Sequence, residues 1–202
     1  MSRINSLLRD AYNLYLRMKL KNKDFSLLCN NCTGSVILQD LGLEFNSPFV
    51  GLWLYPSDFI KYAKNIKHYM SCDLAFIEKK EIDYPVALLD DIEIFFHHYK
   101  NKEEAKEKWI ERTSRINLED LFFLLVEKDG CTYEDLEEFD KLPYKNMVAF
   151  THKMYPYICA SFHIRGFENK GEVEKPYTFK SKRTYKREYD DFDFIGWFNA
   201  EN

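Results

Sequence analysis

Residues 25–42 read FSLLCNNCTGSVILQDLG, and they show the pattern of the chain in its simplest form. The first five residues are a short apolar run, which predicts a buried strand. The polar residues 30–34 predict a turn, and residues 35–41 predict a short helix that ends at Gly42. A strand, a turn and a helix in this order are the repeating unit of α/β proteins.

The same pattern continues on both sides of this stretch. Short apolar runs predict further strands at residues 74–77, 86–89, 92–97, 121–126, 147–150 and 158–164. Helical spacing predicts helices at 3–21, 102–115 and 133–141, and one that starts at Pro56 with an apolar stripe reaching Met70. The helix at 3–21 is amphipathic, and its apolar residues are Ile4, Leu7, Leu8, Ala11, Leu14, Tyr15 and Met18. The polar residues 169–186 predict a long loop, and an aromatic segment follows at 192–198.

Strands alternate with helices throughout, so we expect a single α/β domain. The expected architecture is three-layered, α/β/α, around a largely parallel or mixed sheet. A length of 202 residues fits one domain, and neither an internal repeat nor a linker divides residues 1–202.

The composition excludes several classes of protein. With 46% hydrophobic and 31% charged residues the chain is globular, and its net charge of −4 gives no general attraction for nucleic acid. We see no apolar run that could span a membrane and no secretory signal, so we expect a cytoplasmic protein. Motifs of Rossmann dehydrogenases, P-loop NTPases, ordinary α/β-hydrolases and zincins are missing, so these four classes are disfavoured. The sequence indicates neither a cofactor nor an oligomeric state.

The five cysteines are expected to be reduced thiols. Cys29 and Cys32 form one C-x-x-C pair, but a zinc site needs further ligands at short spacing. The adjacent His97 and His98 would point to opposite faces of a strand, so we predict no metal site. A thioredoxin-like redox pair is also disfavoured, because Cys29 belongs to the predicted strand and Cys32 to the turn.

The turn after the first strand is the main candidate for a functional site. Ligands of α/β sheets bind beyond the carboxyl ends of strands, where a helix N-terminus presents N–H groups. Cys32 is a candidate nucleophile there. The candidate substrate-binding residues are Asn30, Asn31, Thr33 and Gly34. A structural interpretation stays open, in which the asparagines shape the turn, Thr33 caps the helix and Cys32 packs as a small apolar side chain.

Two other segments carry groups that suit acid–base chemistry. One contains Asp91 and Glu93, predicted to bind substrate, and His98, a candidate general base. The other follows a later strand, where His152 is a second candidate base and Lys153 a candidate anion-binding residue. The alternative is that the first segment is a solvated turn with its histidines packed at a strand end, and the second an ordinary polar loop.

Two further segments are interpreted as structural. Asp129 and Gly130 predict a turn, after which Thr132 caps the next helix. Five cations between residues 180 and 187 are followed at once by acidic residues, which favours a solvated loop over a polyanion site.

An ordered series of short motifs runs through the chain between residues 25 and 198. The motifs are NNCTG at 30–34, LGL at 41–43, NSPFVGLW at 46–53, YPVALLDDIE at 84–93, HYK at 98–100, AKEKW at 105–109, RIN at 115–117, DGCT at 129–132 and FDKLP at 139–143. Together they resemble a family of uncharacterised bacterial proteins often labelled exopolysaccharide or capsule biosynthesis proteins. The resemblance implies a role in the assembly or modification of a surface glycan, and it carries over no catalytic residue.

The resemblance and the polar strand ends together favour a transferase of surface-polysaccharide biosynthesis. An activated donor, acyl-CoA or a nucleotide-sugar, would lie over the turn at residues 30–34. His152 or His98 would take a proton from a hydroxyl of the glycan acceptor. The alternatives are a glycan-binding or scaffolding protein of the same pathway, and a thiol-redox protein that uses Cys29 and Cys32.

Overall fold

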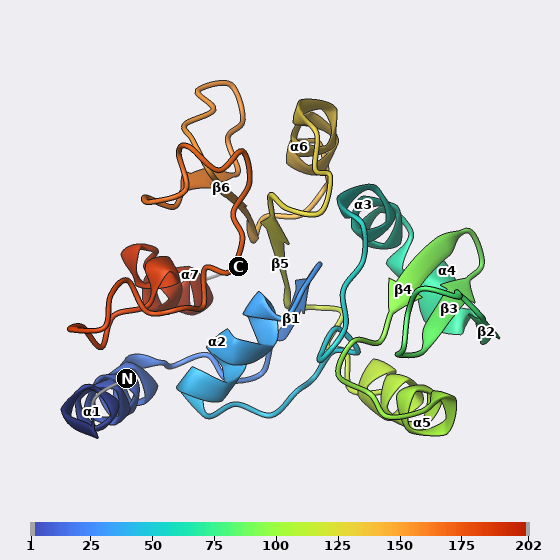
Figure 1. The fold of residues 1–202 in the computed structure, drawn as a ribbon, viewed down its shortest axis with the longest axis horizontal. Helices are drawn as coiled ribbons and strands as arrows, with labels where there is room; N and C mark the ends of the chain where they lie inside the picture. The colour runs from blue at the N-terminus through green and yellow to red at the C-terminus, as the bar shows by residue number, and fades with distance from the viewer. Residues whose placement is uncertain (1–2, 201–202) are drawn as a thin grey trace.

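The computed structural model describes residues 3–200 as a single α/β domain with two β-sheets (Figure 1). One sheet has four parallel strands in the order β1-β5-β6-β7, and the other has three antiparallel strands in the order β2-β3-β4. The strands are β1 (Ser26–Cys29), β2 (Leu74–Ile77), β3 (Val86–Leu89), β4 (Ile92–Phe95), β5 (Leu121–Val126), β6 (Met147–Thr151) and β7 (Ser161–His163). The helices are α1 (Arg3–Lys19), α2 (Thr33–Leu41), α3 (Pro56–Lys64), α4 (Ile66–Ser71), α5 (Lys102–Thr113), α6 (Tyr133–Asp140) and α7 (Phe194–Asn199), with a 3-10 helix η1 (Glu188–Asp191). The predicted α/β class is confirmed, and the sheet content is mixed.

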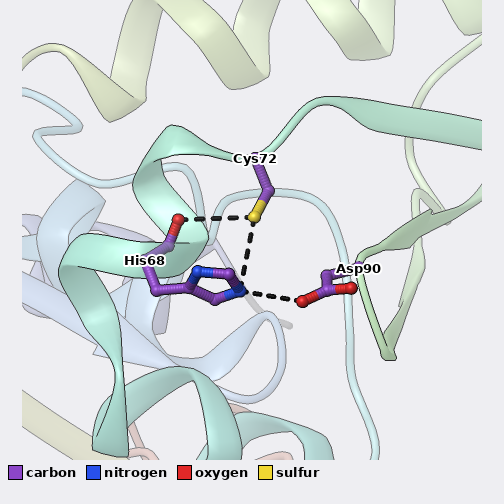
Figure 2. Close-up of side chains that lie close together, drawn as sticks. All are labelled: His68, Cys72 and Asp90. Atoms are coloured by element: carbon purple, nitrogen blue, oxygen red, sulfur yellow. Dashed lines mark hydrogen bonds and ion pairs between the residues drawn. The ribbon is translucent and has the colours of Figure 1, made fainter.

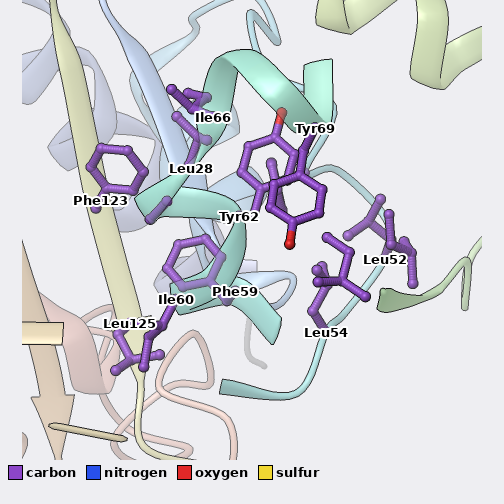
Figure 3. Packing of buried hydrophobic residues seen from close by; sticks show 14 of the residues in the cluster. Leu28, Leu52, Leu54, Phe59, Ile60, Tyr62, Ile66, Tyr69, Phe123 and Leu125 are labelled. Carbon is purple, nitrogen blue, oxygen red and sulfur yellow. The ribbon is translucent and has the colours of Figure 1, made fainter. Parts of the chain in front are cut away.

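Strand β5 lies at the centre of the hydrophobic core, and all six of its residues, LFFLLV, are buried. Successive side chains of a strand point to opposite faces. Phe123 and Leu125 therefore pack in one cluster with residues of α3 and α6, which Figure 3 shows in part. Phe122 and Leu124 pack in a second cluster with residues of α2 and α7. The parallel sheet is thus covered on both faces, as its wholly apolar strand β5 requires.

A short extended segment connects the two sheets. The backbone N–H of Trp53 donates to Phe95 O in β4 at 2.9 Å, and Phe95 N–H donates back to Trp53 O at 3.0 Å. The next residue, Leu54, donates its N–H to Asn30 O at 2.9 Å, directly after β1. These bonds fix the antiparallel sheet beside the carboxyl end of β1.

Helix α1 is amphipathic as predicted, but its apolar stripe faces solvent. Leu7 is 63% exposed, and Leu14 and Met18 are exposed as well. The buried face carries Arg9 and Asn13 instead. An amphipathic surface helix ordinarily buries its apolar stripe. In α1 the buried side chains are polar instead, so polar contacts attach this helix to the domain.

A buried ionic cluster, here called the Asp40 cluster, makes those contacts. Arg9 binds Asp40 and Asp190 at 2.5 Å each, and Asp40 also accepts bonds from Asn13, Tyr189 and Arg187. The cluster joins α1, α2 and the C-terminal segment around η1. Burial alone would raise the pKa of Asp40, but its hydrogen bonds and the two guanidinium groups outweigh burial and hold that pKa below its ordinary value.

Local start and stop signals operate as the sequence predicts. Gly42 adopts a left-handed conformation (φ 66°) and ends α2, and Pro56 is the first residue of α3. Thr132 forms a reciprocal capping box with Asp135 at the start of α6. The helix that the sequence predicts to run on to Met70 is interrupted, because Asn65 leaves helical geometry and divides it into α3 and α4.

The polar segment at 169–186 contains neither a helix nor a strand, as predicted, but it is not simply solvated. Val173 is fully buried, and its N–H donates to Glu127 O at 2.7 Å. Of the basic residues, Lys180 binds Asp191 at 2.6 Å and Arg187 belongs to the Asp40 cluster. Across residues 3–200, no helix has the length and apolar character that crossing a bilayer requires.

Candidate functional site

Two adjoining cavities of about 480 and about 400 Å³ open where polar loops leave β1 and β5. Cys32 follows β1, and Lys128 follows β5. Cys32, His98 and Tyr177 line both cavities, which together we call the β1–β5 cleft. Its position beyond the carboxyl ends of parallel strands is the usual place of ligand sites in α/β sheets.

Asn30 is part of the framework below the cleft. It is fully buried, and its side chain extends the β1–β5 pairing by one residue. Nδ2 donates to Val126 O at 3.0 Å, and Oδ1 accepts from Val126 N at 2.8 Å. Both polar groups of the side chain are therefore used within the protein.

The other polar residues of the turn shape the start of α2. Asn31 Oδ1 accepts a hydrogen bond from Thr33 N at 3.0 Å, and Asn31 also lines the cleft. Thr33 is fully buried and is the first helical residue rather than the cap. A Cβ at Gly34 would lie 2.7 Å from the Cβ of Cys29, so glycine allows α2 to pack closely on β1. Of these three residues, Asn31 is the one placed to meet a ligand.

Cys32 occupies the N-cap position of α2 and lines the cleft. Burial raises the pKa of its thiol, so the neutral thiol dominates at neutral pH. Burial raises the pKa of Cys29 to about 12, and both sulfurs are free thiols. A reactive cysteine ordinarily has a lowered thiol pKa, whereas both of these thiols have a raised one. The raised pKa values disfavour both a thiolate nucleophile and a redox couple.

His98 approaches the same cleft from the segment after β4. The backbone N–H of His98 donates to the carbonyl oxygen of Gly51 at 3.0 Å. A Cβ at Gly51 would lie 3.3 Å from the Cβ of His98. Gly51 also has a left-handed φ of 70°, a conformation that favours glycine, and there is little room for a larger side chain beside His98. Burial, with a smaller contribution from His97, lowers the pKa of His98. A neutral imidazole in a cleft is chemically suited to accept a proton.

A fixed cation stands on the α5 side of the cleft. Arg112 Nη1 donates to the hydroxyl of Tyr99 at 2.6 Å, and this hydroxyl donates to Val50 O at 2.7 Å. The guanidinium also lies 5.4 Å from the ring centre of Phe45. Arg112, Tyr99 and Lys108 line the first cavity beside the start of α2, and so does the carboxylate of Glu104. Lys108 is bound to Glu111 at 2.6 Å, so Arg112 and the positive end of α2 are the groups of this wall that favour an anion.

The second cavity has an aromatic wall. Trp53, Tyr84 and Tyr177 line it, together with Lys128 and Asp129. The Trp53 ring stacks on Phe95 with centroids 3.9 Å apart, which holds the indole in place. Aromatic faces with nearby polar groups suit the mixed apolar and hydroxylated surface of a sugar.

His152 lies at the carboxyl end of β6, and it is not among the residues that line the two cavities. It is buried, and its Nδ1 lies 2.7 Å from Glu127 Oε2. Tyr155 donates its hydroxyl to Glu127 Oε1 at 2.5 Å. A carboxylate on Nδ1 leaves Nε2 as the accepting nitrogen of the ring, the orientation of a general base. Lys153 is exposed and lies over the Tyr155 ring at 5.2 Å.

Asp91 and Glu93 lie at the opposite end of β4 from His98. Asp91 accepts a 2.6 Å hydrogen bond from the hydroxyl of Tyr69. Glu93 binds Lys79 at 2.6 Å. These carboxylates thus contact neighbouring helices and loops, and the structure does not bring them to the cleft.

The sequence predicts Asn31, Cys32 and His98 as site residues, and the structure places all three on the cleft. The sequence did not indicate Arg112, because its pattern does not distinguish this arginine from the other charged residues of the same helix. It also missed Glu127, although a carboxylate directly after a fully apolar strand is a detectable signal, because it stands where strands present ligands.

The fold and the cleft define an α/β domain with a polar and aromatic cleft at the carboxyl edge of its parallel sheet. A sequence profile described as a domain of unknown function (DUF1919) matches residues 3–199, so the chain belongs to that family. The chain is also 43% identical over 198 residues to an uncharacterized protein of Haemophilus influenzae (strain ATCC 51907 / DSM 11121 / KW20 / Rd), covering 98% of this chain and 95% of the relative. The resemblance to uncharacterised bacterial proteins is confirmed at this level, and the polysaccharide pathway stays a prediction.

Proposed function

We propose that the protein is a transferase that binds an anionic activated donor in the β1–β5 cleft and transfers its acyl or glycosyl group to a glycan hydroxyl. The observation that carries the proposal is that His98 and Arg112 line the same cavity at the carboxyl edge of the sheet. Acyl-CoA and nucleotide-sugars both carry phosphates, which a fixed guanidinium and a helix N-terminus bind well.

The proposed step uses His98 as the general base. The hydroxyl oxygen of the acceptor forms a bond to the transferred carbon, and its proton passes to the imidazole nitrogen. The bond from that carbon to the donor breaks, and the departing thiolate or phosphate oxygen keeps the electron pair. With a thiolate, the proton then passes from His98 to sulfur, so CoA leaves as a thiol. Because the pKa of His98 is lowered, the base is already neutral at physiological pH.

The cations of the first cavity provide the sharpest test. Arg112→Gln removes the guanidinium, and Arg115→Gln removes a cation near the end of the same helix that is bound to Glu44 outside the cleft. Calorimetric titration with an acyl-CoA and a nucleotide-sugar should show binding of one donor class. We expect Arg112→Gln to weaken that binding about 10- to 100-fold, which corresponds to one charged hydrogen bond, and Arg115→Gln to leave it unchanged. Equal affinity in the two variants would contradict the assignment of the donor site.

A glycan-binding protein of the same pathway is the second candidate, and the aromatic wall of Trp53, Tyr84 and Tyr177 favours it. The same titrations distinguish the two candidates. Binding of an oligosaccharide without binding of any donor would replace the transferase proposal by this one.

A further inference from the structure

Three side chains outside the β1–β5 cleft converge on one point of the surface (Figure 2). His68 lies in the last turn of α4, and Cys72 follows four residues later, so both are on one side of the helix. Asp90 reaches them from the tight turn between β3 and β4. His68 Nε2 is 2.8 Å from Asp90 Oδ2 and 3.6 Å from Cys72 Sγ. This is the one such group of three His, Cys, Asp or Glu side chains found between residues 3 and 200.

The geometry differs from that of a catalytic triad. In a cysteine–histidine–carboxylate triad the thiol and the carboxylate contact different ring nitrogens, because a proton passes through the imidazole. Here both Cys72 and Asp90 approach the same nitrogen, Nε2 of His68. The three ligand atoms Nε2, Sγ and Oδ2 therefore lie within 4.8 Å of one another, close enough to bind one cation together.

The three ligand atoms lie within 4.8 Å of one another, and their spacing can be compared with the coordination sphere of zinc. Bonds of about 2.0 Å to nitrogen or oxygen and about 2.3 Å to sulfur place tetrahedral ligand atoms roughly 3.3–3.6 Å apart. The nitrogen–sulfur distance of 3.6 Å already meets this requirement. The nitrogen–oxygen distance of 2.8 Å needs a small outward movement of the Asp90 carboxylate, which is over half exposed.

The two elements that carry these ligands are fastened to one another. Tyr69, the neighbour of His68, stacks on Tyr62 of α3 and donates its hydroxyl to Asp91, the neighbour of Asp90. Lys61 of α3 binds the Asp91 carboxylate at 3.1 Å from the other side. Asp90 itself has a positive φ of 57°, a backbone conformation typical of a tight turn. The two elements that carry the ligands are therefore held together by contacts that do not depend on a metal.

We propose that His68, Cys72 and Asp90 form a zinc-binding site with a fourth position open to water or to a ligand. A sulfur, a nitrogen and a carboxylate oxygen are the ligand set of Zn²⁺, whereas Mg²⁺ and Ca²⁺ take oxygen ligands. The site lies on the surface, since the side chains of His68 and Asp90 are 54% and 56% exposed. The proposal is independent of donor binding in the β1–β5 cleft.

Metal titration of the full chain, freed of metal with a chelator, tests the proposal. Zn²⁺ is measured by competition with a chromophoric chelator, and Co²⁺ is added in its place to detect the thiolate-to-cobalt absorption band. We expect one bound zinc, and the cobalt band in the unmodified protein. Cys72→Ser should abolish the band and weaken zinc binding by about tenfold or more, and Asp90→Asn should weaken zinc binding while tolerating the same backbone conformation.

Cys159→Ser is the matched control, because Cys159 is an exposed free cysteine outside the cluster. It should leave the zinc affinity and the cobalt band unchanged. Circular dichroism before titration identifies any variant that has not folded, and Asp90→Asn then takes the place of Cys72→Ser. Absence of stoichiometric zinc, equal affinity in the cluster variants and the control, or equally tight binding of Mg²⁺ would each overturn the proposal.

Discussion

At the scale of single residues, the turn that follows β1 contains residues of two kinds: some hold the fold together and others line the cleft. Asn30 and Gly34 are buried and serve the packing of β1 against β5 and α2, while Cys32 lines the cleft. Chemical type alone does not distinguish these roles, because an asparagine amide bonds a substrate and a backbone equally well. Accessibility and hydrogen-bond partners decide between them.

Asn30→Ala should therefore reduce stability. The substitution leaves Val126 with an unpaired N–H and a less well bonded carbonyl in a buried place, at a cost of about 2–4 kcal/mol in the free energy of unfolding. Urea unfolding measures this loss, and Asn169→Ala, at an exposed loop position, serves as the control. An equal midpoint for the two variants would show that the Asn30 side chain does not extend the sheet.

At the scale of elements, α1 shows that periodicity and orientation are separate properties. The stripe that includes Leu7 and Leu14 predicts the helix correctly, yet Arg9 and Asn13 attach it to the domain. Partners in α2 and η1 make the polar face the buried one.

Substitutions on the two faces of α1 should have very different effects on stability. The double variant Leu7→Gln, Leu14→Gln should change the free energy of unfolding by less than about 0.5 kcal/mol, because both side chains are exposed and glutamine is a good helix former. Arg9→Leu should cost about 3–5 kcal/mol, because it leaves Asp40 and Asp190 buried with a lost partner. Thermal and urea unfolding compare the stability of the variants. A large loss of stability in the double variant would show that the apolar stripe of α1 is buried and not exposed to solvent.

At the scale of the whole molecule, the Asp40 cluster connects both ends of the chain to the sheet. Arg9 comes from the first helix, and Arg187 and Tyr189 come from the last segment. The cluster lies against the face of the sheet that α2 covers, where Tyr189 packs with residues of α2, so we expect its ionisation to change the stability of the domain.

The cluster predicts loss of stability in acid. The folded-state pKa of Asp40 is below its ordinary value of about 3.9, so its contribution is present above that value and disappears as pH falls through the folded pKa. Asp40→Asn should lower stability at neutral pH and make the remaining stability less dependent on pH below about 4. Urea unfolding across this range measures the slope, with the exposed Asp10→Asn as control. An unchanged slope in Asp40→Asn would remove Asp40 as its source.

The sequence by itself determined the α/β class, most strands and several of the helix starts and stops. The buried run of β5, the stop at Gly42, the start at Pro56 and the cap at Thr132 depend on neighbouring residues, which a sequence displays directly. The division of the strands into two sheets and the inward face of α1 were decided by the tertiary structure. So was the convergence of His68, Cys72 and Asp90, since two of these residues lie 22 positions apart. Such features depend on which distant residues come into contact when the core packs, and the local periodicity of the sequence does not predict those contacts.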